Sequence, residues 1–144
     1  MKPLASPRIS VANRQRKIAV DRAKLEAFAR RALPLCARAR GACLTNLSVI
    51  EVVLISDRRM SELHRRFMQV SGPTDVITFQ HGEICISVET ARRQAKAFGT
   101  SVKHELRLYL VHGLLHLHGL DDHEPAGRKR MQSIQKNIVA LAAR

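Results

Sequence analysis

The sequence predicts an α+β fold, a small mixed four-stranded sheet packed with about five helices. Three observations support it: short β-branched runs, longer stretches with apolar residues at helical spacing, and an order in which the two types are mixed as β α β α β β α α α. A length of 144 residues with 45% hydrophobic residues suits one core. We therefore expect residues 1–144 to form a single domain.

The first half of the chain predicts two strands and two helices. Residues 8–15 are predicted as the first strand, and residues 47–56 as the second because they alternate and are rich in Val and Ile. Residues 21–39 have apolar positions at helical spacing, with Asp21 as the N-cap. Residues 57–68 follow as a second helix.

The second half predicts a strand pair followed by three helices. Residues 75–79 and 83–88 are short strands separated by a Gln-His-Gly turn. Helices are predicted over residues 89–99, 102–119 and about 127–142. The apolar content of residues 102–119 indicates a helix that is buried on more than one side.

Charge is the most distinctive feature of the composition. Lys and Arg number 25 against 12 acidic residues, giving a net charge of +13. Such a surplus attracts polyanions, of which nucleic acid is the commonest, although the arginine-rich composition of a high-GC genome would also produce it. The basic residues are spread along the chain, which favours a folded basic surface over a disordered arm.

The chain shows no sign of membrane insertion or secretion. There is no run of about 18 apolar residues, and the basic N-terminal stretch lacks an apolar signal core. We expect a cytoplasmic protein with no membrane partner.

The stretch HGLLHLHGLDDHEP, residues 112–125, predicts a metal site. His112 and His116 are four residues apart, so both rings lie on one face of a helix. Gly119 ends the helix and lets a third ligand from the following LDDH turn back towards them. Three protein ligands are usual for a catalytic zinc ion, of which we expect one per chain. The structural alternative is a pair of core histidines that are hydrogen-bonded inside a buried helix.

Two neighbouring residues restrict this interpretation. His118 points about 200° away from His116 on an ideal helix, so it is predicted to be a surface or interface histidine outside the site. Gly113 stands where the zinc peptidase motif HExxH carries its glutamate base, which argues against peptide hydrolysis. Gly113 also costs about 1 kcal/mol of helix stability, so we expect it to permit close packing or substrate approach.

Several segments together resemble the YbeY family of metal-dependent endoribonucleases. The metal stretch is similar to the family signature HGxLHLxGxDH, PTDVITF (73–79) to its TDVLSF strand, and GEICISVETARRQA (82–95) to its GDIxISxExAxxQA segment. This resemblance over about residues 45–135 implies an α+β fold, an RNA substrate, and zinc on His112, His116 and His123. It also implies ribosomal RNA maturation and ribosome quality control.

Three departures from the family pattern affect the predicted site. GLDDH is one residue longer than the usual GYDH, so the third ligand is predicted as His123, with Asp121 or Asp122 as the alternative. Met68 aligns with an arginine of the family, and its thioether cannot stabilise the charge of a phosphate. Glu83 stands where the family has an aspartate.

Asp75 is a further candidate for the catalytic machinery. It precedes the strand VITF and is predicted to orient a ligand histidine. Its alternative role is that of a turn residue at the start of a strand.

The predicted function is zinc-dependent, single-strand-type endoribonuclease activity on ribosomal RNA, in maturation of the small-subunit 3′ end. The predicted catalytic residues are His112, His116 and Asp75. Ribosomal proteins are expected as further partners. The alternative, favoured by Met68, is a non-catalytic, metal-stabilised module that binds the ribosome or RNA. A zinc hydrolase of small molecules or peptides is disfavoured by Gly113.

Aromatic residues are only 3% of the chain, so recognition is predicted through shape and phosphate rather than base stacking. Phe67, Phe79 and Tyr109 are the candidate stacking residues outside the first helix and Phe98.

Overall fold

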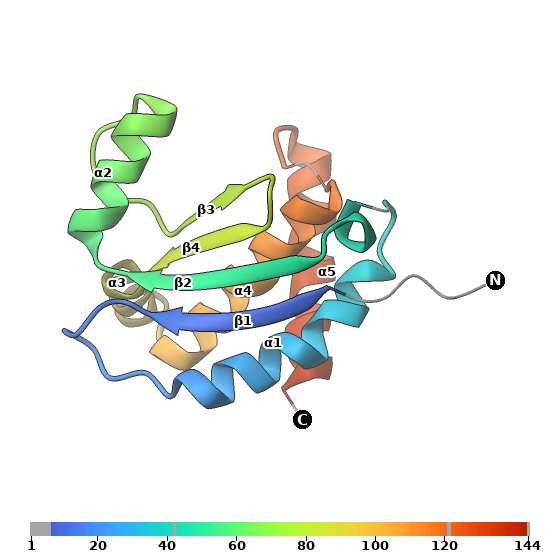
Figure 1. Ribbon diagram of the computed structural model, residues 1–144, viewed down its shortest axis with the longest axis horizontal. Helices are drawn as coiled ribbons and strands as arrows, with labels where there is room; N and C mark the ends of the chain where they lie inside the picture. Colours follow the sequence, from blue (N-terminus) through green and yellow to red (C-terminus); the bar gives the residue numbers. More distant parts are fainter. Residues whose placement is uncertain (1–6, 42, 121, 144) are drawn as a thin grey trace.

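The computed structural model describes residues 7–41, 43–120 and 122–143, and within them it confirms the predicted fold class. A mixed four-stranded sheet has the order β1-β2-β4-β3. Its strands are β1 (Arg8–Asn13), β2 (Val49–Ile55), β3 (Val76–Phe79) and β4 (Glu83–Ser87). Strands β1, β2 and β4 are parallel, and β3 pairs with β4 antiparallel, so β3 is an outer strand (Figure 1).

Five α-helices surround this sheet in the described part of the chain. They are α1 (Arg22–Ala37), α2 (Asp57–Met68), α3 (Val88–Phe98), α4 (Val102–His118) and α5 (Pro125–Ala142), with a short 3-10 helix η1 (Cys43–Asn46) before β2. Asp21 caps α1 as predicted, and Ser56 caps α2. Among the described ranges, no helix is both long and apolar enough to cross a membrane.

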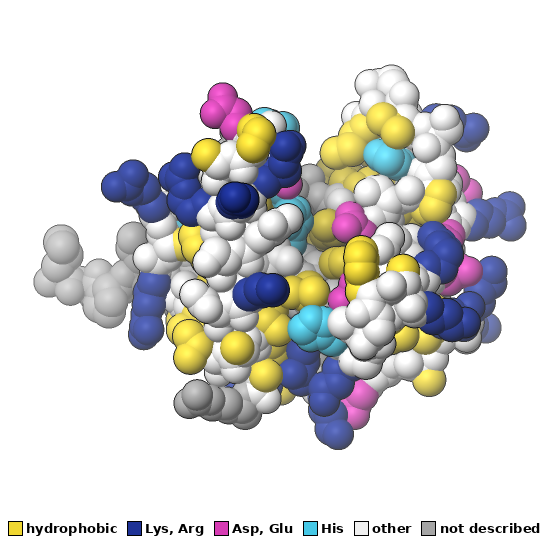
Figure 2. Space-filling model, turned by 180° about the vertical axis from the view of Figure 1, so that it is seen from behind, with side chains coloured by type: hydrophobic (Ala, Val, Ile, Leu, Met, Phe, Trp, Pro, Cys, Tyr) yellow, Lys and Arg dark blue, Asp and Glu magenta, His cyan; other side chains and the backbone are white. Residues whose placement is uncertain are grey.

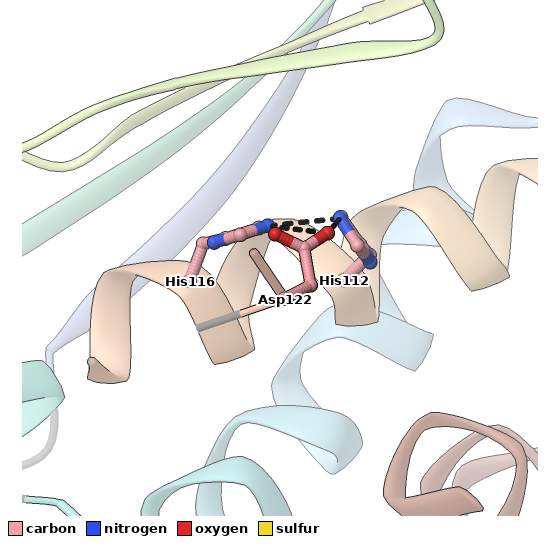
Figure 3. Close-up of side chains that lie close together, drawn as sticks. All are labelled: His112, His116 and Asp122. Carbon is pink, nitrogen blue, oxygen red and sulfur yellow. Dashed lines mark hydrogen bonds and ion pairs between the residues drawn. The ribbon is translucent and has the colours of Figure 1, made fainter. Parts of the chain in front are cut away.

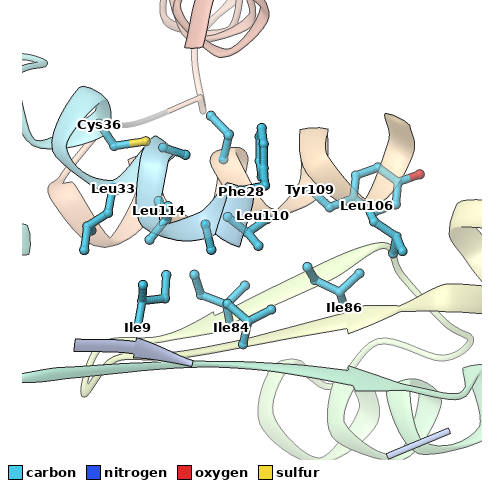
Figure 4. Close-up of a cluster of buried hydrophobic side chains, with 14 of the residues drawn as sticks. Ile9, Phe28, Leu33, Cys36, Ile84, Ile86, Leu106, Tyr109, Leu110 and Leu114 are labelled. Atoms are coloured by element: carbon cyan, nitrogen blue, oxygen red, sulfur yellow. The ribbon is translucent and has the colours of Figure 1, made fainter. Parts of the chain in front are cut away.

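The main core lies between one face of the sheet and helices α1, α4 and α5. Figure 4 shows Ile9, Ile84 and Ile86 of the strands facing Phe28 of α1 and Leu110 of α4. The opposite face of the sheet packs against α2, through a small cluster of buried side chains: Val53, Ile55, Met60, Leu63, Ile77 and Cys85. Helix α2 therefore lies on the opposite face of the sheet from α1, α4 and α5, and it contacts α3 through its first turn (Figure 1).

A carboxylate ties α2 to α3. Asp57 accepts hydrogen bonds from Ser87 Oγ at 2.6 Å and Thr90 Oγ1 at 2.7 Å, and it forms an ion pair with Arg93. Burial disfavours the charge on Asp57, but the hydrogen bonds from Arg93, Ser87 and Thr90 outweigh it and hold its pKa below the usual range. The charged form therefore stabilises the fold.

Replacing Asp57 with asparagine is expected to lower the free energy of unfolding by about 1–3 kcal/mol at neutral pH. Because its pKa is depressed in the folded state, this stabilisation is complete above the unfolded pKa of about 3.9 and is lost as pH falls through the folded pKa. Urea unfolding at several pH values should show the wild type and the variant converging in acid. Glu62→Gln, on the exposed side of the same helix, is the control; an equal difference at every pH would refute the prediction.

Gly113 allows α4 to approach the sheet closely, as one of its two predicted roles requires. A Cβ added there would lie 2.7 Å from Ile84 Cγ2, inside the core. The glycine therefore positions the helix that carries both site histidines, one of which, His112, precedes it directly.

We expect Gly113→Ala to destabilise the protein although alanine is the better helix former. Overpacking costs about 1–3 kcal/mol, whereas the gain in helix propensity is about 1 kcal/mol. Thermal unfolding of Gly113→Ala, Ile84→Ala and the double variant would measure their coupling. If the double variant loses less stability than the two single variants lose together, close packing is supported. Simple additivity of the two losses contradicts it.

Candidate metal centre

The side chains of His112, His116 and Asp122 converge at the C-terminal half of α4 (Figure 3). The two Nε2 atoms of the histidines are 2.9 Å apart. Asp122 Oδ2 lies 3.7 Å from His112 Nε2 and 3.6 Å from His116 Nε2. We call these three residues the metal cluster. Gly119, with φ of 110°, is the left-handed residue that ends α4 and turns the chain back, as the sequence predicts.

The geometry of the metal cluster fits a single metal ion. Ligands at 2.0–2.1 Å in tetrahedral geometry lie about 3.3 Å from one another. The three donor-to-donor distances, 2.9, 3.6 and 3.7 Å, bracket this value. All three side chains are half-buried, so they are accessible to an ion and to a substrate.

Gln135 of α5 fixes the orientation of the first histidine. His112 Nδ1 donates a hydrogen bond to Gln135 Oε1 at 3.0 Å. That bond places the ring proton on Nδ1 and leaves the lone pair of Nε2 directed at the cluster. Sequence reasoning missed Gln135, because nothing in the pattern of α5 indicates which residue faces α4.

The predicted ligand His123 is not part of the metal cluster. It is exposed and lines an open cleft of about 790 Å³ together with Arg40 and Arg130. The other alternative, Asp121, lies outside the described residues. The signature HGxLHLxGxDH has its last histidine ten positions after its first, and ten positions after His112 stands Asp122.

Asp75 makes the contacts of a residue at the start of a strand. Its Oδ1 accepts hydrogen bonds from the backbone N–H of Val76 at 2.8 Å and from Thr74 Oγ1. Burial first, and then the charge of Asp75, raises the pKa of Tyr109, which lies one turn before His112 on α4. Its predicted role in orienting a ligand histidine stays a prediction.

The prediction that His118 is a surface or interface residue is wrong. Its side chain is fully buried, Nε2 donates to Ala39 O at 2.8 Å, and Nδ1 accepts from Leu44 N–H. The segment between α1 and β2 folds over this side of α4, which periodicity within α4 cannot reveal. His118 is a structural histidine and does not belong to the metal cluster, as predicted.

Figure 2 shows a hollow between the lobe that contains α2 and the body that contains α4 and α5. Histidine, acidic and hydrophobic side chains lie in it, and Lys and Arg side chains are spread over the surrounding surface. This distribution agrees with the predicted folded basic surface. A polyanionic chain can therefore approach from several directions.

The family model and the curated relatives agree on one family. A family model described as Endoribonuclease YbeY matches residues 10–142. A relative from Frankia alni named Endoribonuclease YbeY is 32% identical, over 92% of this chain and 81% of its own. Another of the same name from Gluconobacter oxydans is 36% identical, over 76% of this chain and 69% of its own. A solution structure of a Thermotoga maritima protein superposes with a TM-score of 0.65 at 26% identity, covering 93% of this chain and 88% of that one.

Proposed function

Because the chain belongs to the YbeY endoribonuclease family, we propose that it hydrolyses phosphodiester bonds inside single-stranded RNA, with one zinc ion held by the metal cluster. The observation that carries this proposal is the convergence of His112, His116 and Asp122 at donor distances suited to one ion. When bound, zinc supplies Lewis-acid activation of water and of a phosphoryl oxygen.

The residues of the chain itself have three tasks in this reaction. The metal cluster binds the ion, and Gln135 holds the His112 proton at Nδ1 so that Nε2 stays free to coordinate. Exposed basic residues at the start of α5, namely Arg128, Lys129 and Arg130, bind flanking phosphates. Affinity for RNA should therefore fall steeply as salt rises.

We propose Asp122 as the third ligand, in place of the predicted His123. Asp122 occupies the sequence register of the family's last histidine, and its carboxylate faces both histidines. One measurement distinguishes Asp122 from His123. Asp122→Ala should lose the metal and His123→Ala should keep it, by elemental mass spectrometry; the reverse result would establish His123.

The biological role follows from the family as a second part of the proposal. We infer that the substrate is ribosomal RNA, in maturation of the small-subunit 3′ end and in ribosome quality control, with ribosomal proteins as partners in the cytoplasm. One domain over residues 1–144 would perform this function, with Asp75 near the site.

A circular single-stranded RNA tests the reaction, because only an endonuclease can open a circle. We expect the zinc-loaded protein to linearise it, chelation to stop the reaction, and added zinc to restore it. The alternative of a non-catalytic RNA-binding module is favoured by Met68, which lacks the charge of the family's arginine. Salt-sensitive RNA binding with metal bound, but with every circle intact, would establish that alternative.

A further inference from the structure

Two of the few aromatic residues meet on the surface beside β3. Phe67, in the last turn of α2, is 51% exposed, and its ring centroid lies 5.2 Å from that of Phe79 at the end of β3. The ring of His81, exposed in the following turn, stacks on Phe79 with centroids 5.9 Å apart and planes inclined by 24°. We call Phe67, Phe79 and His81 the aromatic platform.

The platform includes exposed apolar surface. Phe79 packs at the edge of the small cluster under α2, whereas Phe67 continues outwards from it. Met68 and Val70, which follow Phe67 in the chain, are also exposed, with 48% and 46% of their area accessible. Exposed apolar residues that gather in one segment make this segment a candidate binding surface.

The charge around the platform indicates the kind of ligand. The guanidinium of Arg66 lies 5.4 Å from the centroid of the Phe67 ring, and Arg65 is exposed in the same helical turn. One acidic residue, Glu83, is the cross-strand partner of Phe79, so the basic charge lies on the Phe67 side of the platform. Aromatic rings next to guanidinium groups match one nucleotide of an unpaired strand, because the base offers a π-face and the adjacent phosphate a negative charge. Duplex RNA would keep its bases inside the stack.

We propose that the aromatic platform binds an unpaired nucleobase of single-stranded RNA by stacking, with Arg66 near the adjoining phosphate. The inference rests on the proposed function and deepens it, since it selects single strands over duplexes. It revises the prediction that recognition avoids stacking: two of the three candidate residues lie together and are joined by His81, while the third, Tyr109, is buried.

Fluorescence anisotropy with labelled oligoadenylate and a labelled RNA duplex tests the platform on the full metal-loaded chain. We expect Phe67→Ala to weaken oligoadenylate binding about tenfold and to leave duplex binding unchanged. Phe98→Ala is the matched control, because Phe98 is 71% exposed and stands outside the platform. Phe67→Leu should bind as weakly as Phe67→Ala, since leucine keeps the apolar contact but has no π-face.

Salt dependence separates stacking from phosphate binding. Phe67→Ala should lower affinity without changing the slope of log affinity against log salt, whereas Arg66→Ala should reduce the slope by about one. Unchanged oligoadenylate affinity in Phe67→Ala would overturn the platform and leave protein docking as the use of this surface. Failure of the wild type to bind any RNA would overturn the proposed function itself.

Discussion

Replacing His112 with alanine is expected to abolish metal binding at the cluster and to reduce RNA cleavage at least about a thousandfold, because the hydrolytic step depends on the ion. The two remaining donors, His116 and Asp122, cannot supply the three protein ligands that are usual for a catalytic ion. Single-turnover cleavage of the circular RNA at saturating enzyme measures the effect on the reaction rather than on binding.

His104→Ala is the matched control for this variant. His104 is an exposed histidine on the first turn of the same helix and lies outside the metal cluster. The His104→Ala variant should cleave RNA at the wild-type rate and keep its metal. Cleavage by His112→Ala within tenfold of the wild-type rate would show that the reaction does not use this centre.

Replacing Gln135 with alanine is expected to weaken metal affinity about 10- to 100-fold, as loss of an orienting hydrogen bond to a ligand histidine does. The His112 ring would lose the acceptor that holds its proton on Nδ1. Competition with a chromophoric chelator measures the affinity, and the rate at saturating zinc should stay close to that of the wild type.

Gln135→Glu separates orientation from simple packing. The carboxylate keeps the acceptor oxygen for Nδ1–H and should retain metal affinity at or above the wild-type level. Gln132→Ala, one turn earlier on α5, serves as the control. Equal metal affinity in the wild type and Gln135→Ala would exclude the positioning role.

Local patterns were sufficient to predict most of the fold. The alternation and β-branching of residues 47–56 predict β2, and the helical spacing of residues 57–68 predicts α2 with the observed bounds. The predicted ends of the elements were less accurate. Strand β1 ends at Asn13 rather than at residue 15, and α5 begins at Pro125 rather than near residue 127. Proline is suited to the first helical position because that position needs no amide donor. These shifts do not move any residue of the site.

The features of the site that the sequence did not predict depend on contacts between segments that are distant in the chain. The i, i+4 spacing of His112 and His116 is a local property and predicted their convergence. The contact between Gln135 and His112 joins two helices, and the burial of His118 depends on the segment after α1; neither is encoded in the period of a single helix.

The third ligand shows a different limit. The resemblance to the family pattern predicts His123, whereas the position in the chain, ten residues after His112, favours Asp122. Gly119 sets the direction in which the chain leaves α4, so the number of residues after it decides which side chain returns to the histidines. Register, rather than residue type, therefore brings Asp122 next to His112 and His116 in the structure, and the identity of the third ligand stays a prediction.

The most direct test of the central claim is the metal content per chain of the freshly purified wild-type protein, measured by elemental mass spectrometry. The arrangement of His112, His116 and Asp122 predicts about one zinc ion per chain, resistant to dialysis and removed by strong chelators. Protein that is folded but binds no zinc, either as purified or after zinc addition, would contradict the metal centre and leave the two histidines as a hydrogen-bonded pair on a helix.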